Sequence, residues 1–99
     1  MDIINAIAKV RFASARPQKV HLGGLARTPV ELLCMEPGQK LQVPHGQWAY
    51  YVVSGTACVE SKITTAHLPA GQVAVTAMDE DHTIAAEGEH RLVCLVIGK

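Results

Sequence analysis

The chain has 99 residues and a mass of 10.6 kDa, with nine basic and nine acidic side chains and a formal net charge of zero at pH 7. This length fits one compact domain and excludes two, and an apolar content of 48% is enough to fill a core. Binders of nucleic acids and anionic membranes normally carry a basic excess, so the composition predicts neither as a partner.

Residues 1–27 are predicted to form an N-terminal segment with a helical turn and an edge strand. Apolar residues recur at helical spacing within residues 3–8, and any helix there ends before Pro17. No basic region precedes an apolar stretch, so the start does not resemble a secretory signal. No apolar run approaches the roughly 20 residues that cross a bilayer. Residues 28–99 are expected to form a barrel, within a single domain over residues 1–99.

From residue 30 onward, short strand-like runs alternate with glycine, proline and acidic turns, which indicates an all-β sandwich or barrel. The expected strands cover residues 30–35, 41–43, 48–53, 56–59, 62–68, 72–77, 82–86 and 91–97. Ser54-Gly55 directly separates two of these runs and is predicted to be a hairpin turn. Val73 and Val75 alternate and are expected on one face.

The last run, Leu92–Ile97, is apolar on both faces. Such a pattern is typical of a strand that is covered on two sides. We expect a dimer partner to supply the outer cover and to protect the edge strands, so the protein is predicted to be a homodimer.

The chain contains three widely separated cysteines, Cys34, Cys58 and Cys94, and no Cys-x-x-Cys pair. This spacing predicts neither a disulfide framework nor a zinc finger. Because each cysteine has apolar neighbours, we expect buried, unreactive thiols and a reducing, cytoplasmic location.

Two stretches resemble the motifs of the cupin family. Cys34–Gly38 followed by Pro44–Gly55 looks like the first motif, which runs from a Pro-Gly turn through His-x-His and Glu to Tyr-Val-Leu-x-Gly. Pro69–His82 is similar to the second motif, Gly-x5-Pro-x-Gly-x2-His-x3-Asn. Arg91–Val96 also looks like the last strand of single-domain bacterial cupins. The resemblance covers roughly the last two-thirds of the chain and implies a double-stranded β-helix, the cupin jelly-roll barrel.

The second motif is only partly kept. Counted from Gly71, Ala77 stands at the position of the proline, Asp79 at that of the glycine and Ala86 at that of the asparagine. His82 stands at the position of the metal-ligand histidine, and its alternative role is that of a polar residue at the start of a strand.

The first motif departs further. Cupin metal sites typically use two histidines and a glutamate from this motif and one histidine from the second. Only His45 and His82 match plainly. If His45 is the first histidine, Gln47 occupies the second position, and the glutamate position falls at Tyr51 or Val52.

Counting back from Gly55 instead places Trp48 at the glutamate position, and both alignments stay open. In either case a carboxylate is missing. Two imidazoles and one amide oxygen would make a weak, open site in which a divalent cation keeps its full charge. The expected cofactor is therefore none, or a divalent metal ion held by His45 and His82.

The residues at or near the motif positions are the candidates for lining a ligand pocket: His45, Gln47, Trp48, Tyr50 and His82. In a regular strand Trp48 and Tyr50 point one way and Tyr51 the other. Tyr51 is expected in the core, while Trp48 and Tyr50 are either core or pocket floor. A tryptophan at the lost carboxylate position would plug the metal cavity. His67 and His90 are expected at the surface, and His21 is ambiguous.

These patterns favour a small-molecule-binding cupin of unassigned ligand with a degenerate or absent metal site. One alternative is a metal-dependent enzyme, dioxygenase- or isomerase-like, in which His45, Gln47 and His82 hold the ion. Another is a structural or interaction module whose barrel is filled by side chains and whose dimer surface is functional. Since no other catalytic signature is present, the sequence leaves open whether the protein is an enzyme.

Overall fold

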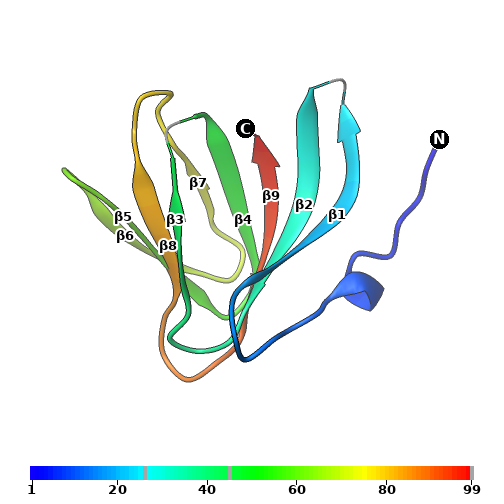
Figure 1. Cartoon of the computed structure of the whole chain (residues 1–99), viewed down its shortest axis with the longest axis horizontal. Helices are drawn as coiled ribbons and strands as arrows, with labels where there is room; N and C mark the ends of the chain where they lie inside the picture. Colours follow the sequence, from blue (N-terminus) through cyan, green and yellow to red (C-terminus); the bar gives the residue numbers. More distant parts are fainter. Residues whose placement is uncertain (26, 45, 99) are drawn as a thin grey trace.

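Short apolar runs, separated by glycine, proline and acidic turns, fold into two antiparallel sheets that face each other (Figure 1). The computed structural model describes residues 1–25, 27–44 and 46–98. Within them, one sheet has five strands in the order β1-β2-β9-β4-β7, and the other has four in the order β3-β8-β5-β6. The all-β prediction is therefore confirmed. The elements in chain order are η1 (Ile7–Lys9), β1 (Gln18–Leu25), β2 (Thr28–Met35), β3 (Lys40–Val43), β4 (Trp48–Ser54), β5 (Thr56–Ser61), β6 (Thr65–Pro69), β7 (Val73–Val75), β8 (His82–Ala86) and β9 (Leu92–Gly98).

The predicted helical turn is present as the 3-10 turn η1, which spans Ile7–Lys9 and only partly overlaps residues 3–8. Ile3 and Ile7 stay exposed, and a helix this short is not stable without an apolar face to pack on. The predicted edge strand is present as β1, which pairs only with β2 among the described strands. In the part of the chain that the structure describes, no helix has the length and apolarity to span a membrane.

Strand β9 lies in the middle of the five-stranded sheet, between β2 and β4. One face of β9 points into the space between the sheets and belongs to the main buried core, through Leu92, Cys94 and Val96. Val93 points to the outer face, where it belongs to a second buried cluster. The prediction that both faces of this strand are covered is therefore confirmed.

The outer face of β9 is covered by the chain's own N-terminal segment. Val93 packs there with Leu32 and Cys34 of β2. Val10 and Phe12 lie against this cluster from the segment that runs beside β1 and β2 in Figure 1. This part of β9 therefore needs no dimer partner to cover it, contrary to what we expected.

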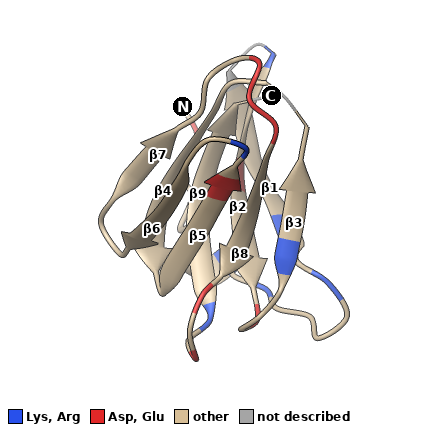
Figure 2. Ribbon diagram, turned by 90° about the vertical axis from the view of Figure 1, so that its left-hand side faces the viewer, with Lys and Arg blue, Asp and Glu red and all other residues tan. Residues whose placement is uncertain are grey.

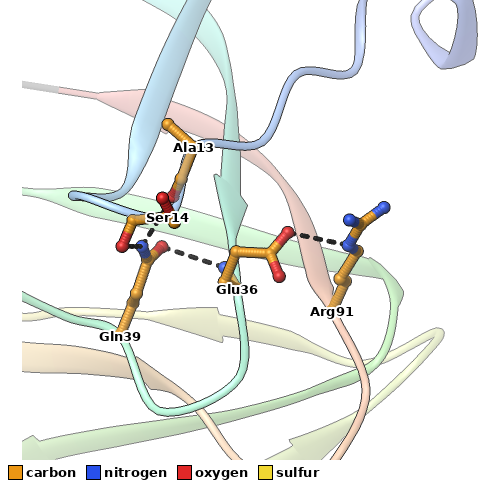
Figure 3. Close-up of polar contacts among 5 residues, drawn as sticks. All are labelled: Ala13, Ser14, Glu36, Gln39 and Arg91. Carbon is orange, nitrogen blue, oxygen red and sulfur yellow. Dashed lines mark hydrogen bonds and ion pairs between the residues drawn. The ribbon is translucent and has the colours of Figure 1, made fainter.

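Polar contacts fix the N-terminal segment to the turn after β2 and to the start of β9 (Figure 3). The Gln39 side-chain amide donates to the Ala13 carbonyl at 2.7 Å, and its oxygen accepts from the Glu36 backbone N–H at 2.9 Å. The Arg91 guanidinium pairs with the Glu36 carboxylate at 2.8 Å. It also lies over the Phe12 ring, 4.5 Å from the centroid. These contacts hold the segment on the outer face of the sheet.

The prediction of a hairpin at Ser54-Gly55 is wrong. Strand β4 pairs with β7 and β9, whereas β5 pairs with β6 and β8, so the chain crosses here from one sheet to the other. Gly55 has φ +82°, and a Cβ atom at this position would lie 2.3 Å from the Arg91 carbonyl oxygen. Glycine is required because the crossing strand passes directly against the start of β9.

Two other strands are shorter than expected. The run over residues 62–68 forms strand only from Thr65, because a turn precedes it: the Ser61 hydroxyl accepts from the Thr64 backbone N–H at 3.2 Å. The run over 72–77 pairs as a strand only at Val73–Val75. Val73 and Val75 are both exposed there, which is consistent with the predicted shared face.

Candidate functional site

A buried tyrosine and a buried histidine meet between the two sheets. Strand β8 alternates buried and half-buried residues, so His82, at its start, points inward like Ile84. In β4, Tyr50 points inward with Val52. The Tyr50 hydroxyl lies 2.7 Å from His82 Nε2, and the rings meet edge to face with centroids 5.4 Å apart. Tyr50 is 2% exposed and His82 3%. Because β4 and β8 belong to different sheets, this contact joins the sheets.

Both ring nitrogens of His82 have partners. Nδ1 lies 3.3 Å from the Glu80 carbonyl oxygen, which can only accept a hydrogen bond, so Nδ1 carries the proton. With Nδ1 protonated, a neutral imidazole offers the Nε2 lone pair, and the Tyr50 hydroxyl donates to it. The tautomer therefore follows from the two partners.

The surroundings of Tyr50 keep its hydroxyl protonated. Burial raises the pKa of the phenol well above its ordinary value, and the nearby Cys94 raises it further. A phenol in this state remains a hydrogen-bond donor throughout the physiological range. The His82 Nε2 lone pair is therefore engaged by a proton that is not readily lost.

Trp48 fills the interior beside Tyr50. Its side chain packs against the core from β4, and its backbone N–H donates to the Thr76 hydroxyl at 3.0 Å. The indole Nε1 is buried and has no hydrogen-bond partner among the described residues. A cavity of about 10 Å³ lies beside Trp48 and Tyr50, which is room for about one water molecule. Side chains therefore fill the interior around Trp48 and Tyr50.

A larger hollow of about 110 Å³ lies on the other side of His82. Its described lining residues are Val59, Ser61, Thr64, Ala66, Ala74, Val75, Thr76, Glu80 and His82. The Glu80 carboxylate accepts the Ala77 backbone N–H at 3.2 Å, and this bond, helped by a hydrogen bond with Ser61, lowers the pKa of Glu80. The described lining thus contains one carboxylate that is ionised at neutral pH, hydroxyl groups and the His82 imidazole, and it contains no lysine or arginine.

Several solved structures have the same fold as this chain over nearly its whole length. A protein from Thermus thermophilus, TT1209, matches with a TM-score of 0.92 at 22% identity, over 99% of this chain and 96% of that chain. A conserved protein from Klebsiella pneumoniae with a double-stranded β-helix domain matches with a TM-score of 0.86 at 22% identity, over 99% and 89%. An RmlC-like cupin from Desulfovibrio desulfuricans matches with a TM-score of 0.84 at 20% identity, over 99% and 95%. The chain has the cupin fold.

The double-stranded β-helix expected from the resemblance is thus confirmed, and at these identities the likeness concerns the fold alone. No protein-family model and no curated protein sequence matches the chain. What the chain binds must therefore be argued from its own side chains.

The cupin barrel separates the residues predicted to line a pocket. Trp48, Tyr50 and His82 face the interior. Gln47 is exposed and lines a hollow beside the outward-facing Ile97. His45 lies outside the described residues.

Tyr51 is not in the core, contrary to expectation. It is 42% exposed, and it stands opposite Val73 of β7 and Leu95 of β9 on the outer face of the sheet. Alternation along β4 requires this orientation once Tyr50 points inward. Cys34 and Cys94 are buried as expected, whereas Cys58 is only half-buried on the outer face of the other sheet.

Among the described residues, His82 does not have enough metal-ligating neighbours for a usual metal site. Glu80 is the one carboxylate in the described lining of the hollow beside His82, and it accepts the Ala77 backbone N–H, while the Tyr50 hydroxyl occupies the Nε2 lone pair that a metal would need. Within the described residues, which leave out His45, His82 belongs to no group of three metal-ligating side chains. The polar contacts that the structure gives His82 among the described residues are hydrogen bonds.

Sequence reasoning missed most of the lining of the hollow. Thr76 is buried, and its hydroxyl donates to the Gly46 carbonyl, although it stands in an alternating run where a polar residue is expected at the surface. Glu80 belongs to the acidic run Asp79-Glu80-Asp81, and carboxylates in such turns are normally solvated. The signal in the sequence is its position two residues before His82, which keeps its carboxylate near the start of β8.

Proposed function

We propose that this cupin binds a small molecule without a metal ion, because its metal site is degenerate. The observation that carries the proposal is the 2.7 Å contact between the Tyr50 hydroxyl and His82 Nε2. It uses the imidazole nitrogen that would otherwise bind an ion. It also links the two sheets beside the hollow that His82 lines.

The lining of the hollow favours a neutral or positively charged ligand of a few non-hydrogen atoms. Its volume of about 110 Å³ is smaller than the roughly 300–1,000 Å³ of sites that take drug-sized molecules. The Glu80 carboxylate and the Thr64 hydroxyl supply hydrogen-bond acceptors, and the described lining offers no lysine or arginine for an anionic ligand. Desolvating an anion beside a carboxylate would cost free energy.

Thermal unfolding tests this proposal with matched pairs of small amines and carboxylates of equal size. We expect the amines to raise the melting temperature more than the carboxylates do, since only the folded state binds them. Glu80→Gln should remove this difference. Manganese, iron, nickel, copper and zinc ions form a second panel, in which His82→Ala should respond as the wild type does.

A metal-induced stabilisation that His82→Ala abolishes would contradict the degenerate site and favour the metal-dependent enzyme. Greater stabilisation by carboxylates than by amines would contradict the proposed ligand class. Stabilisation by neither would favour an interaction module with a filled barrel.

We also propose a homodimer, with a second copy of the chain against the outer face near β7. Tyr51, Val73 and Val75 are exposed there, and Tyr51 and Val73 are cross-strand neighbours. None of these side chains is charged, so two copies of the patch can meet without repulsion between like charges. Sedimentation velocity should give the mass of a dimer for the wild type and of a monomer for Val75→Lys. A monomeric wild type would contradict this proposal.

A further inference from the structure

Outside the barrel interior, three side chains with different donor atoms converge on the outer face of the four-stranded sheet. They are Cys58, His67 and Glu87, and one ligand atom from each lies within 4.8 Å of the other two. Figure 2 views the molecule from this side, with β5, β6 and β8 toward the viewer. This cluster is separate from His82, which faces the interior from the same sheet.

The sheet register brings these residues together. Cys58 of β5 stands directly opposite His67 of β6. Their strand neighbours Ala57 and Leu68 point into the core, so Cys58 and His67 point outward. Glu87 follows β8, and its backbone N–H donates to the Thr56 carbonyl at 2.9 Å, which fixes it beside β5.

The Glu87 carboxylate is the centre of the cluster. His67 Nδ1 lies 2.6 Å from Glu87 Oε2, and the Cys58 thiol also hydrogen-bonds to Glu87. The side chains of His67 and Glu87 are 61% and 41% exposed, so an ion can reach them from solvent. The His67 imidazole and the Cys58 thiol thus both donate a hydrogen bond to the Glu87 carboxylate. A metal cation bound by all three side chains can take the place of these two protons.

From this arrangement we propose that Cys58, His67 and Glu87 form a site for a zinc ion, with a fourth position open to solvent. Thiolate, imidazole and carboxylate are the three side-chain ligands of zinc. Bond lengths of about 2.0–2.3 Å place the donor atoms of a tetrahedral zinc site about 3.3–3.7 Å apart. Donors within 4.8 Å of one another need only a small movement to reach this spacing.

The charges around Cys58 suit a divalent cation. Burial, followed by the carboxylates of Glu87 and Glu60, raises the pKa of the Cys58 thiol, and Lys40 acts in the opposite direction. The thiol is therefore protonated in the absence of a metal. The same carboxylates attract a dication, and zinc binding should release the thiol proton to solvent.

Calorimetric titration of zinc ions into the full-length protein tests the site. We expect one ion per chain, and Cys58→Ser and His67→Ala should each weaken binding by about tenfold or more, since even the loss of an outer-shell partner commonly costs that much. His90→Ala, which removes an exposed histidine outside the cluster, is the matched control and should bind as the wild type does. Cobalt ions provide a second measurement, because a sulfur-to-cobalt charge-transfer band should appear in the wild type and be absent from Cys58→Ser.

No saturable zinc binding, or binding that Cys58→Ser and His67→Ala leave unchanged, would overturn the proposal. Binding that only His82→Ala weakens would place the ion inside the barrel, which contradicts both the surface site and the degenerate interior site. Binding that persists in His82→Ala and is lost in Cys58→Ser supports the surface site and leaves the proposed ligand site in the barrel untouched.

Discussion

Replacing Gly55 with alanine is expected to destabilise the fold by about 2–4 kcal/mol, the sum of a strained backbone conformation and a clash in a packed region. Gly55 has φ +82°, and the added Cβ atom would lie 2.3 Å from the Arg91 carbonyl oxygen. Both atoms belong to backbone, so a flexible side chain cannot move away to relieve the contact. The crossing between the sheets must shift instead.

Gly88 provides the matched control. It has φ +80°, almost the same as Gly55, but nothing lies within 4 Å of a Cβ atom placed there. Gly88→Ala should therefore carry only the backbone cost, about 1–2 kcal/mol. Chemical denaturation with urea measures both variants against the wild type. Equal losses of unfolding free energy in the two would contradict the close packing of the crossing against β9.

Removing the Tyr50 hydroxyl is expected to lower the free energy of unfolding by about 1–3 kcal/mol, because Tyr50→Phe leaves the buried His82 Nε2 without a partner. The ring remains, so the packing of the core is kept and the effect reports on the hydrogen bond. Tyr51→Phe is the control, and both substitutions are compared in the monomeric Val75→Lys background. The Tyr51 hydroxyl is exposed on the outer face there, so its loss should cost no more than about 0.5 kcal/mol.

A double-mutant cycle with His82→Ala separates the pair from other effects of the substitutions. If the two groups bond to each other, the loss caused by Tyr50→Phe should shrink in the His82→Ala background. Additive losses, or equal losses for Tyr50→Phe and Tyr51→Phe, would mean that the two side chains do not share a hydrogen bond.

Alternation along single strands was readable from the sequence. Val73 and Val75 share a face, Trp48 and Tyr50 point inward together, and the doubly apolar β9 lies in the middle of its sheet. These features depend only on the period of a strand and on how much of it is buried, and both leave a pattern in the residues. The motif resemblance added the double-stranded β-helix.

Features that depend on long-range packing could not be predicted from the sequence in this way. Ser54-Gly55 has the composition of a hairpin turn, but a glycine with positive φ serves equally well where a chain crosses between sheets. Likewise, the apolar outer face of β9 indicated that something covers it, but the sequence did not show which part of the chain does so. That Phe12 supplies part of it depends on how residues far apart in the sequence meet.

The same distinction between local pattern and long-range packing applies to the candidate site. The sequence placed Tyr50 and His82 as candidates, but not their hydrogen bond, because the contact spans two sheets whose separation no local pattern encodes. Cys58 and His67 were interpreted as a buried thiol and an isolated surface histidine. Only the register of β5 against β6 makes them neighbours.

The state of the His82 ring nitrogens tests most directly whether the interior site is closed to metals. Nitrogen-15 NMR of the histidine-labelled protein reports the tautomer of each imidazole, before and after zinc ions are added. We expect His82 to carry its proton on Nδ1 and to be unaffected by zinc, while the His67 signals shift. A His82 Nε2 signal that moves to a metal-bound position on addition of zinc would contradict the closed interior site.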